Sequence, residues 1–289
     1  MQAEIERLRI IRPYASGGLS RGENGAIVAV VVCKSAVQGG VMAGFDRSAG
    51  PVVIIASVER ELVQLVRELR AEPVDAGGGR RIWRADTESG QVYLAISGIG
   101  KVNAAVVSTL LLERFSPRLV VNIGCGGAYR GSGLQVGGLA VAIAEVYGDE
   151  GVLTLDGWHS LELIGIPSVE RKGNRYSNEF PLSMQTATRV FQFAASLGLP
   201  VKRGKFITVS TCSGTSNRGD ELYSRFGGIC ENMEGAALAH VALLYDTPML
   251  EVRGISNMVE DRDISKWDIP LSVEMVQRFI YRCLERGVI

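Results

Sequence analysis

The chain has 289 residues, no formal net charge and 46% hydrophobic residues. This is enough apolar material for one large α/β domain with a well-buried core. The balanced charge gives no support for a nucleic-acid partner, because such proteins carry a basic excess. Five cysteines without CxxC spacing and only two histidines predict no metal site, and reduced thiols indicate a cytoplasmic protein. No apolar stretch reaches the length of a membrane span, so we expect no membrane partner.

From Pro51 onward, short apolar strands alternate with amphipathic helices. We expect strands at 52–56, 92–96, 119–123, 138–143, 205–209 and 249–252. We expect helices at 59–69, 103–115, 184–197, 235–244 and 272–284. This alternation predicts an α/β fold in which helices cover a largely parallel sheet.

Residues 1–50 do not follow this pattern, because they combine a charged helical start with stretches rich in glycine and serine. We predict a poorly ordered N-terminal extension over 1–50 and one domain over 51–289. A working start near Met42 and a functional arm are the alternatives for the extension.

Two glycine-containing segments follow expected strands. SGIGKVN at 97–103 opens a helix, where backbone N–H groups can face a polar ligand. The dinucleotide fingerprint fails because Asn103 occupies the third glycine position, and the P-loop pattern is absent. GCGG at 124–127 closes a buried strand, and close backbone packing explains it equally well. Two such loops at strand carboxyl ends mark the usual ligand crevice of an open α/β sheet.

Five motifs in this order resemble the nucleoside phosphorylase/nucleosidase superfamily. They are IASVERE at 55–61, SGIGKVNAA at 97–105, NIGCGG at 122–127, MEGAALAH at 233–240 and RGISN at 253–257. The resemblance implies a single-domain, three-layer αβα fold with a mixed, mostly parallel, twisted central sheet. It also implies a purine nucleoside as the substrate, no cofactor, and a homo-oligomer built from dimers.

Three further segments resemble one branch of that superfamily, the futalosine hydrolases. They are TVSTCSGT at 208–215, SNMVEDRD at 256–263 with Trp267, and SLELIGIP at 160–167. This resemblance implies hydrolysis of the bond between hypoxanthine and ribose in futalosine, which yields dehypoxanthine futalosine in the alternative menaquinone pathway. Futalosine is a nucleoside whose 5′ side carries a carboxyphenyl ketone.

Breaking an N-ribosidic bond places positive charge on the sugar and negative charge on the departing base. By the resemblance, Glu234 accepts hydrogen bonds from the ribose hydroxyls; a carboxylate that only complements a helix dipole is the alternative. Met233 packs against the ribose or, alternatively, in the core. Glu61 matches the carboxylate that activates water in related hydrolases, and a solvated acid at a helix start is its alternative.

Asn257 stands where adenine-cleaving relatives carry a carboxylic acid. An amide can donate to a 6-oxo group while its carbonyl accepts from a protonated N7. A site built on such bonds rejects analogues that leave a buried polar group unpaired. Asn257 therefore favours hypoxanthine over adenine and joins Glu61 as a predicted catalytic residue; a turn-forming asparagine is the alternative.

Four more residues are predicted to contact the substrate. Gly214 and Thr215 would offer backbone groups to the purine edge, where adenine nucleosidases stack an aromatic residue on the base. Ser97 and Gly98 would approach the sugar from the first glycine loop. Arg253 is either a buried structural residue, paired with a glutamate such as Glu251 or Glu231, or a ligand contact.

Water is the expected nucleophile, because a phosphate pocket calls for arginines around the first glycine loop and 97–101 contains none. Three alternatives remain. An adenine-type nucleosidase acting on methylthioadenosine or adenosylhomocysteine is opposed by Asn257. A purine nucleoside phosphorylase would require phosphate. A non-catalytic nucleoside-binding protein is opposed by the presence of Glu61 and Glu234.

Overall fold

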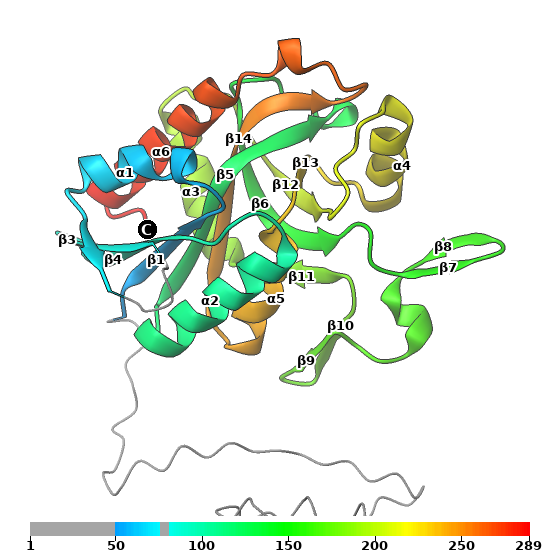
Figure 1. Cartoon of the computed structure of the whole chain (residues 1–289), viewed down its shortest axis with the longest axis horizontal. Helices are drawn as coiled ribbons and strands as arrows, with labels where there is room; N and C mark the ends of the chain where they lie inside the picture. Colours follow the sequence, from blue (N-terminus) through cyan, green and yellow to red (C-terminus); the bar gives the residue numbers. More distant parts are fainter. Residues whose placement is uncertain (1–49, 76–80) are drawn as a thin grey trace, which may run out of the picture. The chain divides into compact units, whose positions relative to one another are not determined.

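The structure is a computed structural model that describes residues 50–75 and 81–289 (Figure 1). The chain divides into two units, Met1–Phe45 and Asp46–Ile289, and the described residues belong to the second. The predicted extension over 1–50 lies outside the described residues, apart from Gly50, and stays a prediction. Within the described ranges, no helix is long and apolar enough to cross a membrane.

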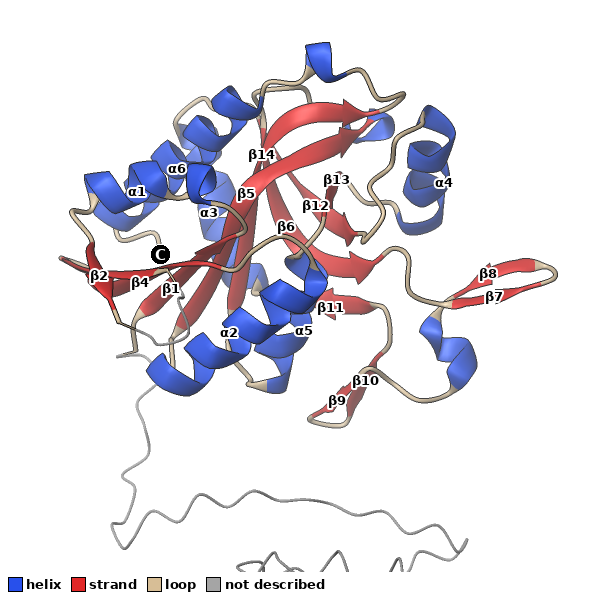
Figure 2. Ribbon diagram, viewed as in Figure 1, coloured by secondary structure: helices blue, strands red, loops and turns tan. Residues whose placement is uncertain are grey.

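Ten strands of the described residues form one large mixed sheet (Figure 2). They are β1 (Val52–Ala56), β2 (Glu72–Val74), β3 (Ile82–Thr87), β4 (Gly90–Ile96), β5 (Leu119–Tyr129), β6 (Leu139–Tyr147), β11 (Glu179–Pro181), β12 (Val201–Thr208), β13 (Cys230–Asn232) and β14 (Met249–Val259). Their order is β2-β3-β4-β1-β5-β13-β12-β6-β11, and β14 pairs with both β5 and β6. The strands β5, β13, β12, β6 and β14 therefore close into a ring, while the β1 side of the sheet stays open.

The longest pairings in this sheet are parallel. β14 runs parallel to β5 from the pair Met249–Val120 to the pair Val259–Tyr129, and β12 runs parallel to β6 along its whole length. β1 is buried at every position, as expected of a strand covered on both faces. The prediction of a mixed, mostly parallel α/β sheet is confirmed.

Helices cover both faces of the sheet. In the described residues they are α1 (Val63–Glu68), α2 (Lys101–Phe115), α3 (Met184–Ser196), α4 (Ser216–Phe226), α5 (Gly235–Leu244) and α6 (Ile269–Glu285). α1, α3 and α6 pack over a core that includes Leu65, Val190 and Phe279, and α2 and α5 pack over a second core that includes Leu111 and Leu238 (Figure 1). The predicted three-layer αβα arrangement is therefore confirmed.

Two small hairpins lie between β6 and β11 and project away from the sheet (Figure 2). Their strands are β7 (Val152–Thr154), β8 (Gly157–His159), β9 (Val169–Arg171) and β10 (Asn174–Tyr176). Several large apolar side chains of this segment are exposed: Leu153, Leu155, Leu163, Ile164 and Ile166. Exposed apolar groups of this kind are typical of surfaces that meet another protein.

Two strands run further than the sequence predicts. β5 continues through Gly124–Gly127, so the expected second glycine loop is wrong and this segment is a strand. β14 likewise continues beyond Val252 and includes Asn257. The reason is the close approach of the neighbouring strands. A Cβ at Gly126 would lie 3.0 Å from the Glu231 carbonyl oxygen in β13, so glycine permits the pairing.

Candidate active site

A cavity of about 300 Å³ opens beside the carboxyl ends of the central strands. Its wall comes from the segment after β1, the middle of β5, the loop after β12, the start of α5, and β14 with the loop that follows it. This is the region where open α/β sheets bind ligands, and the volume is in the range of small-molecule sites.

The cavity brings together four of the predicted site residues: Glu61, Met233, Glu234 and Asn257. They come from separate parts of the chain, so their meeting depends on the fold. Ser97, Gly98, Gly214 and Thr215 do not line this cavity. Their proposed substrate contacts therefore stay predictions.

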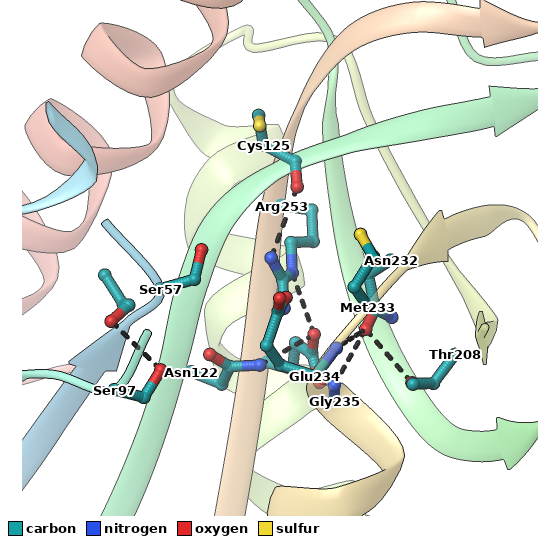
Figure 3. A network of polar contacts seen from close by, with 12 residues as sticks. Ser57, Ser97, Asn122, Cys125, Thr208, Asn232, Met233, Glu234, Gly235 and Arg253 are labelled. Carbon is teal, nitrogen blue, oxygen red and sulfur yellow. Dashed lines mark hydrogen bonds and ion pairs between the residues drawn. The ribbon is translucent and has the colours of Figure 1, made fainter. Parts of the chain in front are cut away.

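The four residues outside the cavity wall have local structural roles. The Ser97 hydroxyl donates to the Gly98 carbonyl at 2.9 Å (Figure 3 shows this part of the network). The Thr215 hydroxyl accepts from the Arg218 N–H at 3.3 Å and caps α4. The Gly214 carbonyl accepts from a backbone N–H of the loop after β14. These bonds hold in place the loops that border the cavity.

Glu61 is 2% exposed, and four hydrogen bonds hold its carboxylate. Oε2 accepts from the Ser57 N–H at 3.1 Å, the Ser57 hydroxyl at 2.7 Å and the Val58 N–H at 3.2 Å. Oε1 accepts from the Cys125 N–H at 2.9 Å. Since each carboxylate oxygen has two lone pairs, Oε1 retains an acceptor position that a water molecule can use. Glu59, by contrast, is exposed, so the solvated-acid alternative describes Glu59 and not Glu61.

The Glu234 side chain does not cap its own helix. Asn232 Oδ1 caps α5 instead, accepting from the N–H groups of Glu234 at 3.0 Å and Gly235 at 2.7 Å (Figure 3). Glu234 Oε1 accepts from the Gly100 N–H at 2.9 Å, and Oε2 lies 3.5 Å from Arg253 Nη2. Both oxygens keep lone pairs for further donors, such as two vicinal hydroxyl groups.

Arg253 lies 2% exposed among three carboxylates. Its Nε donates to Glu251 at 2.8 Å, and its Nη1 donates to the Cys125 carbonyl at 3.2 Å (Figure 3). Burial alone would lower the pKa of Arg253, but the charges of Glu251, Glu234 and Glu61 outweigh burial and raise it. We call Arg253 and these three glutamates the cavity floor. Because three carboxylates surround one guanidinium, the floor has a negative potential, which suits a sugar that develops positive charge.

A further carboxyl group, that of Glu145, interacts with Glu251 of this ion pair. Glu145 is fully buried, and its oxygens accept from the Asn232 amide and the Thr208 hydroxyl, each at 2.7 Å. Burial and the charge of Glu251 raise the pKa of Glu145 well above its ordinary value. Glu145 therefore takes up a proton more readily than an exposed glutamate, and a proton on it can meet Glu251 Oε2, which has no other partner among the described residues.

Glu231, the other glutamate considered as an Arg253 partner, has different partners. It accepts from the Tyr129 hydroxyl at 2.9 Å, the Ser213 N–H at 2.9 Å and the Ser213 hydroxyl at 2.6 Å. Of the two pairings considered, the one between Arg253 and Glu251 is present in the structure. Glu231 instead fixes the loop after β12 against β5.

Asn257 lies inside β14, at a register shift against β5 that follows Ile255. Shifts of this kind turn a side chain toward a new direction, here toward the cavity. Asn257 Oδ1 accepts from the Ser256 hydroxyl at 2.8 Å, and Nδ2 donates to the Met258 carbonyl at 3.0 Å. One amide N–H and one lone pair therefore remain for a ligand. Because the residue belongs to a strand, the turn-forming alternative is wrong.

Two cavity thiols are poor nucleophiles. Burial, assisted by the charge of Glu61, raises the pKa of Cys125 to about 12. Burial and the charge of Glu231 also raise the pKa of Cys212. Since the thiolate is the reactive form, both shifts disfavour sulfur as a nucleophile at neutral pH.

The sequence reasoning did not identify the groups that hold the carboxylates. Ser57, Gly100, Cys125 and Asn232 all lie in or beside the quoted motifs, so their positions were visible. Their roles were not, because each depends on contact with another segment or on a helix start. Arg60 and Arg262, which also line the cavity, lie within the quoted motifs at 55–61 and 256–263, but the sequence reasoning gave them no role.

Residues 51–286 match the Phosphorylase superfamily. The chain belongs to this superfamily. It is 33% identical over 202 residues to the futalosine hydrolase of Thermus thermophilus, covering 70% of this chain and 84% of that protein. It is 29% identical over 215 residues to the 5′-methylthioadenosine/S-adenosylhomocysteine nucleosidase of Maridesulfovibrio salexigens, covering 72% and 86%.

The fold is also similar to solved members of the phosphorylase superfamily. The nucleosidase from Neisseria meningitidis in complex with methylthio-immucillin-A matches with a TM-score of 0.70 at 21% identity, covering 82% of this chain and 99% of that one. Together the comparisons confirm the resemblance inferred from the motifs. They support nucleosidase activity, the hydrolysis of an N-glycosidic bond, for this chain.

Proposed function

We propose that this chain hydrolyses the N-ribosidic bond of futalosine, releasing hypoxanthine and dehypoxanthine futalosine in the alternative menaquinone pathway. The observation that carries the proposal is the Asn257 amide, which lines the cavity with one N–H and one lone pair free. These groups complement the 6-oxo group and a protonated N7 of hypoxanthine. The 6-amino group of adenine would meet an N–H donor instead of an acceptor.

The surroundings of Asn257 favour an amide over a carboxylate. Nδ2 donates to the Met258 carbonyl at 3.0 Å. In an aspartate, an oxygen would face this carbonyl oxygen with no proton between them, unless the carboxyl group were protonated. An unpaired or repelled buried polar group is costly, so the local backbone suits the asparagine. The similarity to the Thermus thermophilus futalosine hydrolase points the same way.

The proposed reaction uses the cavity floor and wall in separate roles. Glu234 accepts hydrogen bonds from the ribose hydroxyls, and Met233 contacts the sugar. As the bond to the base breaks, its electron pair passes to the purine, which takes up a proton from solvent at N7. The negative potential around Arg253 stabilises the cationic sugar, and Asn257 binds the departing hypoxanthine. Glu61 Oε1 accepts a proton from the attacking water, because it is the carboxylate oxygen with a free acceptor position.

The first glycine loop favours water over phosphate as the nucleophile, because its polar groups already have partners. Lys101, the cation of that loop, is paired with Asp149 at 2.5 Å and Glu150 at 2.9 Å. The Gly100 N–H is used by Glu234. The groups that could bind a phosphate at this helix start are therefore committed to carboxylates.

We also propose a cytoplasmic homo-oligomer built from dimers. Exposed apolar side chains support an interface on two segments, the hairpins after β6 and the start of α2. Val102 of α2 is 77% exposed, and Ile99, which also lines the cavity, is 56% exposed. Burying these exposed apolar side chains against another subunit would stabilise the oligomer.

The test is base release in phosphate-free buffer, with futalosine, inosine and methylthioadenosine as substrates and added phosphate as a comparison. The proposal predicts rapid hypoxanthine release from futalosine without phosphate. The second candidate is the methylthioadenosine/adenosylhomocysteine activity named for the Maridesulfovibrio salexigens relative. Preferential adenine release would establish that candidate and remove ours, and a strict need for phosphate would exclude water as the nucleophile.

A further inference from the structure

Two arginines of the cavity wall have no acidic partner among the described residues. Arg60 and Arg262 both line the cavity, and neither guanidinium forms a hydrogen bond or ion pair with another described residue. Arg253, in contrast, is surrounded by carboxylates. These two guanidinium groups therefore present positive charge that the described residues do not neutralise, and an anionic group on the ligand would complement it.

Arg262 is held in a geometry suited to a planar anion. Its guanidinium carbon lies 4.7 Å from the centroid of the Trp267 ring, and its backbone N–H donates to Gly214 at 3.2 Å. A guanidinium stacked on an aromatic face keeps its edge free for bidentate bonds to a carboxylate. Trp267 is half-buried and is the aromatic side chain among the described residues that line the cavity.

Arg262 comes from a different segment of the cavity wall than the residues assigned to the sugar and the base. It belongs to the loop after β14, whereas Glu234 begins α5 and Asn257 lies within β14. Its charge partly offsets the rise in the pKa of Cys212, a cavity thiol, so the guanidinium acts on the cavity. The same part of the wall includes Ile269, an apolar neighbour suited to an aryl group.

We propose that Arg262, stacked on Trp267, determines specificity by binding an aryl carboxylate carried on the 5′ substituent of the nucleoside. Trp267 contacts the aryl ring, and Arg60 adds a second positive charge. This inference rests on the proposed function, since the carboxyphenyl ketone of futalosine is such a substituent. A nucleoside without an acidic 5′ substituent gains no ion pair here and is a poorer substrate.

The experiment compares futalosine with its methyl ester, which has the same ring and no carboxylate charge, in wild type and Arg262→Gln. We expect kcat/KM for futalosine to fall about 10- to 100-fold, the usual effect of losing charge-assisted hydrogen bonds. For the ester, the change should be less than about threefold because no ion pair is lost. Lys266→Gln is the matched control. It removes one charge from the same loop, but Lys266 is 64% exposed and pairs with Glu260 outside the cavity wall.

Equal losses for futalosine and the ester would overturn the inference, because they would indicate a structural role for Arg262. An equal effect of Lys266→Gln would also overturn it, since long-range charge would then suffice. If the wild type does not cleave futalosine, the proposed function fails separately. In that case, inhibition by acetylbenzoate, measured with whichever nucleoside is cleaved, tests the carboxylate site on its own. Inhibition weakened about tenfold or more by Arg262→Gln supports the carboxylate site, and unchanged inhibition refutes it.

Discussion

Replacing Arg253 by methionine removes the guanidinium that lies among Glu251, Glu234 and Glu61. Methionine preserves much of the length and apolar volume of the side chain, so the loss of charge dominates the effect. The arginine is 2% exposed and bonded to Glu251 at 2.8 Å. Breaking a buried ion pair by removing one partner costs about 3–5 kcal/mol, because the remaining charge stays buried without compensation. Unfolding free energies are about 5–15 kcal/mol, so the loss is a large share of the total.

Urea unfolding measures this loss. With a slope of about 3 kcal/mol per molar urea, the midpoint should fall by roughly 1 to 1.7 M. Arg278→Met is the matched control, because Arg278 is 58% exposed and pairs with Glu274 at 3.0 Å on the surface of α6. The control should change stability by less than about 1 kcal/mol. If the two variants unfold within about 0.3 M of each other, the buried ion pair is not stabilising and our account of the cavity floor is wrong.

The pH dependence gives the same test a second readout. The pKa of Arg253 is raised in the folded protein, so its stabilising effect is fully present wherever the unfolded arginine is protonated and is lost only at more alkaline pH. In the methionine variant, Glu251 loses its counter-ion, so its already raised pKa rises further and it binds a proton more readily folded than unfolded. The deficit relative to wild type should therefore shrink as the pH falls from about 8 to about 5. A deficit that grows on acidification would contradict this reasoning.

Three further variants test the site. Glu61→Gln should lower kcat by about 100- to 10,000-fold with futalosine, because an amide cannot take a proton from water; near-normal turnover would exclude Glu61 as the base. Asn257→Asp should lower kcat/KM for futalosine and raise it for methylthioadenosine, each by about tenfold or more, and an unchanged ratio would refute the base-recognition argument. Gly124→Ala places a Cβ 2.7 Å from both Glu61 Oε1 and Arg253 Nη1. It should reduce kcat at least about tenfold, and full activity would show that this packing is not needed.

The elements whose limits are set locally were predictable from the sequence. The expected strand at 52–56 and helix at 235–244 coincide with β1 and α5. β1 is an unbroken apolar run that is buried at every position, and α5 is apolar apart from His240 and is buried along most of its length. By contrast, α4 buries only Gly219 and Leu222 and is composed mostly of polar residues, so few apolar positions mark it in the sequence. It was not expected for that reason.

The remaining features depend on contacts between segments. β5 continues through Gly124 because β14 and β13 pair with it, and no local pattern announces a strand across four residues with three glycines. Motifs located Glu61 and Glu234 in the sequence. Their hydrogen-bond partners Cys125 and Gly100 follow from the register of β5 and the start of α2, which the sequence alone does not specify. The bonds that orient a site are therefore the part that needs the structure.

The most direct test of the central claim is to cleave futalosine in ¹⁸O-labelled water with phosphate present. The measurement shows which oxygen becomes bonded to the ribose carbon that carried the base. A short reaction, quenched before the sugar hydroxyl exchanges, is compared with unlabelled product incubated without enzyme. The account predicts free hypoxanthine and dehypoxanthine futalosine that carries one ¹⁸O atom per molecule. A sugar phosphate, or no cleavage of futalosine while methylthioadenosine is consumed, would contradict it.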